Sequence, residues 1–405
     1  MTRSRIPAWL RNGTRAPRTS TPLARENLIA QRIVRRQRFI VHPLDKVLAA
    51  FILTFVVSTL NTPDPSFSVK WILYIMILIG AYLLVRLAIT NERQMTGVVY
   101  FLILGGAANS FISFFTPTVG SRVGSLVLSN PNALGNFLAL ILPLAAALAL
   151  RDGIPLRTRT LWAVASLLMG ASIILTLSRS SWVGMVVGLT AVAAEKSRAK
   201  YFALIFLLLG SVLFFQPVRK RLFEDRNDPG VVYRQIKIRM AWGMFRANPF
   251  IGQGPGAFQA LAPRAEEWMV AEHSALENLY LQILAEGGLL QAAVFVGVIV
   301  VFTRTALAFL RTAGTGFLQT AVLGSLAACW AALGIGVGEN PLFFPKINWL
   351  VGMHLGIIIT AGEIAPQLSR PATASDPNRT MPPPVTARGA AQRPWTLNRT
   401  RGAPL

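Results

Sequence analysis

The chain has 405 residues, of which 53% are hydrophobic, and its 40 Lys and Arg outnumber 17 Asp and Glu to give a net charge of +23. Only 14% of residues are charged, against about a quarter in soluble domains, which excludes a water-covered globular protein and predicts an integral membrane protein. The single cysteine, Cys329, excludes a disulfide framework and a cysteine-based metal cluster. Three histidines form no HExxH or His-rich motif, so we expect no metal and no cofactor.

The chain begins with a basic tail, which we assign to residues 1–45. Residues 1–46 hold eleven Lys and Arg and two acids, and the C-terminal tail at 366–405 holds six Arg and one Asp. Their Thr-, Arg- and Pro-rich composition predicts disorder. Because Lys and Arg beside membrane segments stay on the cytoplasmic side, both termini are expected there, against anionic lipid. The tails lack the interleaved aromatics of nucleic-acid binders, so no nucleic-acid partner is expected.

Between the tails, apolar runs long enough to cross a bilayer predict an all-α bundle of about ten transmembrane helices. Seven lie in residues 46–215 and three in residues 278–365. The predicted spans are 47–61, 69–89, 97–115, 132–150, 160–177, 182–194, 201–215, 279–303, 317–338 and 349–365. This even number of spans places nearly all the basic connections on the cytoplasmic side, in agreement with the positive-inside rule.

One connection, residues 216–277, is about sixty residues long without a membrane-length apolar run, and carries nine bases and seven acids. A loop of this length is typical of a functional element. Apolar residues at helical spacing in VVYRQIKIRMAWGMFRA predict an amphipathic helix that ends at Asn248–Pro249, and GQGPG predicts a tight turn. We therefore expect a small helical lid over the extracytoplasmic mouth of the bundle.

Arg179 lies in LTLSRSSWVG, between two closely spaced apolar spans. An arginine there is costly unless it meets water or an anion. It can extend to lipid headgroups, or its guanidinium can bind phosphate. Arg239 and Arg246 favour phosphate, since several cations in one pocket suit a diphosphate, but they also fit the polar face of a surface helix.

A second cluster lies in EHSALENLYLQILAEGG. His273 and Glu277 are four residues apart, so on a helix they share a face and form a candidate acid/base pair, although a simple surface contact fits the same spacing. Glu286 lies deeper and requires a partner, and Gly287–Gly288 predicts a helix interruption. His354 and the asparagines of SNPNALGNF are interpreted as interhelical hydrogen-bonding groups.

These three motifs, in this order, resemble the O-antigen ligase and O-antigen polymerase superfamily over roughly residues 130–300. The resemblance implies a metal-independent glycosyltransferase at the outer face of the cytoplasmic (inner) membrane, in cell-envelope polysaccharide or lipopolysaccharide biosynthesis. The donor would be a glycan on undecaprenyl diphosphate, and the acceptor a sugar hydroxyl on a lipid-linked core or growing glycan. The family's two motif arginines fall on Arg179 and Arg239, which would neutralise the departing diphosphate.

The sequence departs from the ligases where they have a His-Asn pair, because the aligned residues are Glu277–Asn278. Either Glu277 or the nearby His273 would then be the base. Two other hypotheses stay open: a secondary transporter of a small anion such as bicarbonate, and a non-catalytic subunit of a polysaccharide assembly complex. A transporter is expected to show mid-membrane charges and an internal repeat, and neither is evident in the sequence.

Overall fold

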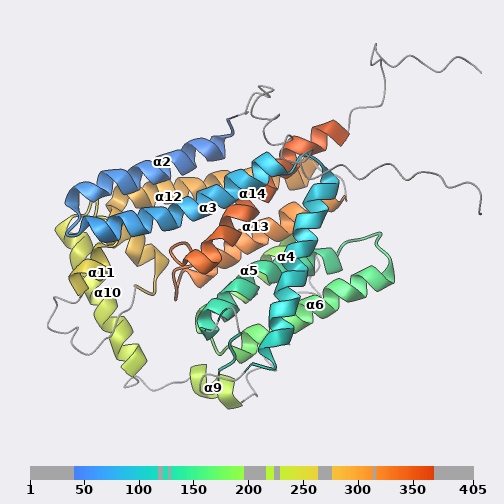
Figure 1. The fold of residues 1–405 in the computed structure, drawn as a ribbon, viewed down its shortest axis with the longest axis horizontal. Coiled ribbons are helices and arrows are strands. Elements are labelled where there is room, and N and C mark those ends of the chain that lie inside the picture. Colours follow the sequence, from blue (N-terminus) through green and yellow to red (C-terminus); the bar gives the residue numbers. More distant parts are fainter. Residues whose placement is uncertain are drawn as a thin grey trace, which may run out of the picture. The chain divides into compact units, whose positions relative to one another are not determined.

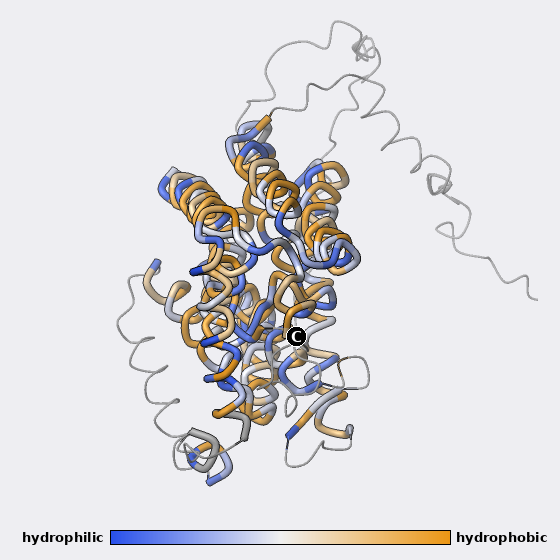
Figure 2. Tube along the Cα trace, turned by 90° about the vertical axis from the view of Figure 1, so that its left-hand side faces the viewer, coloured by the Kyte–Doolittle hydropathy of each residue, from blue (hydrophilic) through white to orange (hydrophobic). Residues whose placement is uncertain are grey.

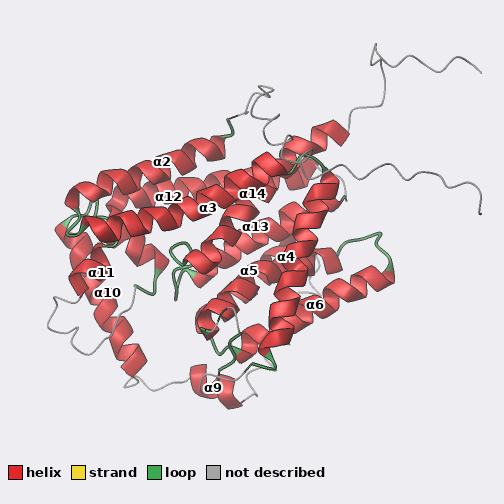
Figure 3. Ribbon diagram, in the orientation of Figure 1, coloured by secondary structure: helices red, strands yellow, loops and turns green. Residues whose placement is uncertain are grey.

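A computed structural model describes residues 41–116, 122–125, 128, 130–195, 216–222, 229–262, 276–312 and 316–368. Within these ranges the regular structure is helical (Figure 1, Figure 3). The predicted span at 201–215, residues 1–40 and 369–405 of the two tails, and His273 lie outside the described residues. Residues 43–45 and 366–368, which were assigned to the tails, are helical. Most of the described chain belongs to one compact unit that runs to Pro366.

Within the described residues, eight helices are long and apolar enough to cross a membrane, which confirms a polytopic helical membrane protein. Figure 2 shows hydrophobic residues along the helices of the bundle. The eight are α2 with its 3-10 extension (Pro43–Asn61), α3 (Pro65–Ala88), α4 (Glu92–Ser113), α5 (Pro131–Ala149), α6 (Leu156–Leu175), α12 (Leu279–Thr312), α13 (Phe317–Ile335) and α14 (Pro345–Leu368). The predicted span at 182–194 lies in α7 (Arg179–Glu195), which has 17 residues.

Two of these helices, α5 and α13, form the centre of the bundle and are 83% buried over their most apolar windows, against about a third for α2, α3 and α4. Helix α7 packs on both central helices. Small residues permit this close approach: a Cβ on Gly184 would lie 2.5 Å from Cγ1 of Ile335, and one on Gly188 would lie 2.8 Å from Cγ of Pro143. Such small-residue contacts are typical of membrane helix packing.

At one end of the bundle, Arg86 joins three helices. Its guanidinium contacts Asp45 of α2 and Glu363 of α14, each at 2.5 Å, and also the Tyr82 hydroxyl of its own helix α3. The arginine side chain is 2% exposed. A buried guanidinium is tolerated only when its donors are satisfied, so this cluster fixes the relative positions of α2, α3 and α14.

The predicted interruption of α12 is confirmed, because Gly288 has a non-helical backbone (φ 65°, ψ −166°). The GQGPG turn occupies the break: the amides of Gln253 and Gly254 donate to the carbonyls of Ala285 and Glu286, at 3.0 and 2.9 Å. In return, the Leu289 amide donates to the Pro249 carbonyl at 2.8 Å. The turn thereby satisfies backbone groups that the broken helix leaves open.

The segment before this turn contains α9 (Gln216–Leu222) and α10 (Pro229–Ala247), and α11 (Ala257–Leu261) follows it. Helix α10 ends at Ala247, just before the predicted stop at Asn248–Pro249, and packs against α12. In Figure 1, α10 and α11 lie at the end of the bundle where α2 meets α3. Two hydrogen bonds fix this position, from Asn61 Nδ2 to the Gly252 carbonyl at 3.0 Å and from Ser68 Oγ to the Pro255 carbonyl at 2.8 Å.

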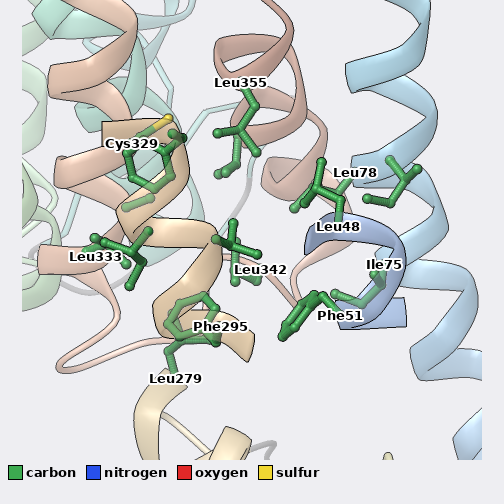
Figure 4. A pocket seen from close by; sticks show the side chains of 16 residues that line it. Leu48, Phe51, Ile75, Leu78, Leu279, Phe295, Cys329, Leu333, Leu342 and Leu355 are labelled. Carbon is green, nitrogen blue, oxygen red and sulfur yellow. The ribbon is translucent and has the colours of Figure 1, made fainter. Parts of the chain in front are cut away.

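An apolar pocket lies between α2, α3, α12, α13 and α14 (Figure 4). Its lining consists of hydrophobic side chains together with Cys329. Leu279 and Leu342 belong to this lining and follow closely after Glu277 and Glu339 in the sequence. The pocket lining is therefore close in sequence to two carboxylates, one before α12 and one between α13 and α14.

Candidate functional site

The predicted arginine motif forms the turn between α6 and α7. Leu177 has a positive φ of 50°, an uncommon conformation for a residue with a side chain, and α7 begins two residues later at Arg179. The start of α7 is fixed by Ser181, whose hydroxyl donates to Oδ1 of Asn136 in α5 at 2.7 Å. A Cβ on Gly135 would lie 2.5 Å from the Ser181 hydroxyl, so only glycine fits beside this bond. The turn thus presents the amino end of α7, which favours anions.

A polar chain beside this turn connects Arg122 to Glu339. The Arg122 Nε donates to the Thr176 carbonyl at 2.8 Å, and its Nη2 donates to Oδ1 of Asn132. Because that oxygen accepts from a cation, the other amide atom must be the nitrogen. It donates to Oε1 of Glu339 at 2.5 Å. The chain links the connection before α5, the first turn of α5 and the loop between α13 and α14.

Helix α10, which we call the lid helix, contacts the bundle through Glu277. Its carboxylate pairs with Arg234 Nε at 3.0 Å and with Lys237 Nζ at 3.4 Å, both from α10. The lysine side chain is only 6% exposed, so its charge depends on this partner. Glu277 is therefore an attachment point for the lid.

Three contacts bring these two groups together. The Leu279 amide donates to the Gly336 carbonyl and Asn278 Nδ2 to the Val337 carbonyl, both at 2.9 Å. A Cβ on Gly338 would lie 3.5 Å from Cβ of Ser180, so the loop carrying Glu339 also contacts the start of α7. We name the resulting group the polar end cluster. Its members are Arg122, Asn132, Arg234, Lys237, Glu277 and Glu339.

Burial and the negative charge of Glu277 raise the pKa of Glu339 to about 7, against the opposing effects of the Asn132 hydrogen bond, Arg234 and Lys237. A carboxyl with this pKa exchanges a proton near neutral pH. The cluster therefore combines fixed cations with one group that can take up or release a proton.

A second chain runs from the lid to the same loop. Glu286 accepts from the Phe258 amide at 3.3 Å and from Gln282 Nε2 at 3.1 Å, and Gln282 in turn accepts from Asn340. Glu286 is 2% exposed, and these bonds provide the partners that its position requires. These bonds connect Phe258, which follows the GQGPG turn, to Asn340, the residue after Glu339.

The other residues singled out from the sequence lie as follows. Arg179 is partly buried at the head of α7, whereas Arg239 and Arg246 lie on the exposed face of α10, opposite Lys237. Glu277 lies just before the start of α12. Its predicted partner His273 is outside the described residues, so the pair stays a prediction. The interhelical role predicted for His354 is confirmed by its contact with Ser325 at 3.3 Å.

Sequence reasoning did not identify Glu339, Arg122, Arg234 or Lys237 as site residues. One signal was available: Glu339 is one of only 17 acids in the chain and lies in a short connection between two apolar spans. Arg234 and Lys237 form the face of α10 that pairs with Glu277. The grouping of Arg179, Arg239 and Arg246 around a diphosphate stays a prediction.

Comparison with known proteins finds one family match, which covers part of the chain. Residues 164–296 match the O-antigen ligase family, which confirms the resemblance to the O-antigen ligase and polymerase superfamily. The matched segment contains Arg179, α10 and Glu277. No curated protein matches the sequence. A solved structure described as "Structural coordination of polymerization and crosslinking by a peptidoglycan synthase complex" superposes with a TM-score of 0.45 at 15% identity, covering 78% of this chain and 96% of that chain.

Proposed function

On the premise that residues 164–296 match the O-antigen ligase family, we propose that this protein is a glycosyltransferase of the cell envelope. It transfers or polymerises a glycan from an undecaprenyl-diphosphate carrier onto a sugar hydroxyl. The reaction takes place at the outer face of the cytoplasmic membrane, with both chain termini in the cytoplasm. The partners are the lipid-linked donor, a sugar or lipid-linked glycan acceptor, and membrane lipid.

The observation that carries this proposal is the polar end cluster itself. Transfer from a diphosphate carrier requires cations where the leaving group gains negative charge and a base where the acceptor loses its proton. The described residues bring three cations, Arg122, Arg234 and Lys237, to the same end of the bundle as two carboxylates, Glu277 and Glu339. These groups supply both requirements without a metal, so the reaction is proposed to be metal-independent.

In addition to the cations of the polar end cluster, the diphosphate is assigned to Arg179, Arg239 and Arg246. Arg179 stands at the amino end of α7, where the guanidinium and the helix dipole both favour an anion. Arg239 and Arg246 lie on the exposed face of the lid helix, and Arg246 stacks on Trp242 with its guanidinium carbon 5.6 Å from the ring centre. From there they would attract the negatively charged donor and bind the exposed part of its diphosphate, while Arg179 contacts the departing phosphate.

The acceptor hydroxyl is assigned to the region of Glu277 and His273. Glu277 lies at the head of α12 and within the cluster, which suits a group that orients or deprotonates the acceptor. Its two ion pairs with α10 couple that role to the docked lid.

The lipid part of the donor is assigned to the apolar pocket. A polyprenyl diphosphate is an amphiphile, and the pocket lining includes Leu279 and Leu342, each within three residues of a cluster carboxylate. The isoprenoid chain would lie among these side chains with its diphosphate at the polar end cluster.

The test is to incubate the purified protein in lipid with an undecaprenyl-diphosphate-linked oligosaccharide, with and without a lipid-core acceptor, and to analyse the products by mass. Product on the core identifies a ligase, and a lengthened carrier-linked glycan identifies a polymerase. No product with authentic envelope donors would overturn the proposal in favour of transport or a non-catalytic subunit. Addition of EDTA is expected to leave the rate unchanged.

A further inference from the structure

The loop between α13 and α14 carries a carboxylate that the matched segment 164–296 does not include. Glu339 follows a turn in which the amides of Gly338 and Glu339 both donate to the Ile335 carbonyl at 3.0 Å. This turn ends the buried helix α13, and Phe343 and Ile347 then bury the start of α14. Glu339 thus stands on a short loop with fixed ends, which suits a group that must be held in place.

Two described neighbours orient the carboxylate. Asn132 binds Oε1 at 2.5 Å, and the Asn132 amide is itself held by Arg122, which is fixed to the Thr176 carbonyl. Within the described residues no hydrogen bond reaches the second oxygen, Oε2. Glu277 differs, because each of its oxygens pairs with a lid cation. One oxygen of Glu339 is therefore held, and the other can meet a hydroxyl.

We propose that Glu339 is the general base of the transfer reaction, with Asn132 and Arg122 as its positioning residues, and that Glu277 docks α10 and orients the acceptor. This inference rests on the proposed glycan transfer. The acceptor hydroxyl gives its proton to Glu339 while the hydroxyl oxygen forms a bond to the anomeric carbon of the donor. The bond from that carbon to the diphosphate oxygen breaks, and its electron pair leaves with the carrier diphosphate beside Arg179. Glu339 then returns the proton to water.

The electrostatic surroundings of Glu339 agree with this role. Glu277 faces it from the head of α12, Arg234 and Lys237 from α10, and Asn132 from α5. Burial and the charge of Glu277 together bring its pKa to about 7. A base with a pKa near the working pH is ionised in a large fraction of molecules and still takes a proton readily.

The experiment measures transfer against pH at saturating donor for the wild type, Glu339→Gln and Glu339→Asp. Glu195→Gln, at the far end of α7, is the matched control. A positioned base contributes about 100- to 10,000-fold, so Glu339→Gln is expected to lose at least ~100-fold in rate. The wild-type rate is expected to rise with pH around pH 7, and Glu339→Gln should lose this rise. Donor binding should persist, because glutamine keeps an oxygen for Asn132.

Asn132→Ala tests whether Glu339 acts as a base or only as a structural contact, because this variant removes the hydrogen bond to the carboxylate and leaves the carboxyl group in place. This variant should be slower yet keep a rise of rate with pH, since the carboxyl remains. A Glu339→Gln enzyme with wild-type rate and pH profile would overturn the inference, and the glycan transfer of the wild type would then still stand. A wild type that transfers no glycan at all would instead overturn the proposed function.

A second measurement does not depend on activity. Lowering the pH from about 8 to about 6 should produce a protonated-carboxyl infrared band in the wild type that Glu339→Gln lacks. Identical spectra of the two proteins would contradict a base poised near neutral pH.

Discussion

Gly252 of the lid turn and Gly288 of the broken helix α12 lie backbone against backbone. A Cβ on Gly252 would be 2.3 Å from the Glu286 carbonyl carbon, and a Cβ on Gly288 would be 2.5 Å from the Phe250 carbonyl carbon. Both residues have positive φ, 69° and 65°. The contact allows the hydrogen bonds that join the segment after α10 to α12, so the two motifs that the family resemblance reports as separate segments act as one structural unit.

Replacing Gly288 by Ala should therefore lower stability by at least about 2 kcal/mol, since a left-handed alanine costs roughly 1–2 kcal/mol before the contact with Phe250 is counted. Gly297→Ala, in the same helix with nothing within 4 Å, should be neutral or stabilising by about 0.5–1 kcal/mol. Thermal unfolding in detergent measures both. Equal melting temperatures for the two variants would refute a close contact at Gly288.

Glu277→Gln should loosen the lid, because it removes the charge that pairs with Arg234 and the nearly buried Lys237. Leaving such a lysine unpaired is expected to cost about 1–2 kcal/mol, given that the carboxylate is one-third exposed. Hydrogen exchange of the α10 amides should then be roughly tenfold faster. Gln235→Ala on the exposed face of α10 is the control, and unchanged exchange in Glu277→Gln would show that this carboxylate does not dock the lid.

Arg179 and the two exposed lid arginines should differ in their kinetic effects. If Arg179 meets the departing phosphate, Arg179→Ala should lower kcat by about 100-fold or more, as the loss of a transition-state donor does. Arg239→Ala and Arg246→Ala remove exposed charges, each worth up to about 1 kcal/mol, and should raise KM by up to about fivefold in a salt-sensitive manner. Steady-state kinetics at two salt concentrations separates the cases; a normal kcat in Arg179→Ala would disprove the proposed diphosphate contact.

The raised pKa of Glu339 also predicts a change of stability with pH. Its pKa is about 7 in the folded protein against an ordinary value of 4.5, so between these values the folded state binds more protons than the unfolded state. This contribution to the free energy of unfolding is complete below about pH 4.5, declines as the pH rises to about 7, and is then lost. Glu339→Gln should remove the decline and melt at a higher temperature than the wild type at pH 8. Parallel melting curves from pH 5 to 8 would contradict this pKa.

The membrane class, most helix positions and the break in α12 were predictable because they depend on local properties of the chain. A run of apolar residues must span a bilayer whatever it packs against. Gly287–Gly288 and Asn248–Pro249 interrupt helices through their own backbone preferences. The same local chemistry predicted that Glu286 needs a partner, although only the structure identifies Gln282 and the Phe258 amide as its partners.

The composition of the site was decided by tertiary structure. Asn132 and Glu339 are 207 positions apart and meet because α5 and α13 pack together at the centre of the bundle. Both helices are apolar on nearly every face, so no amphipathic pattern indicates which side of each turns toward the other. The inward face of α10 is likewise set by the ion pairs with Glu277, which select Arg234 and Lys237 over Arg239 and Arg246. Composition shows that cations and acids exist in this chain, whereas helix packing determines which of them share a site.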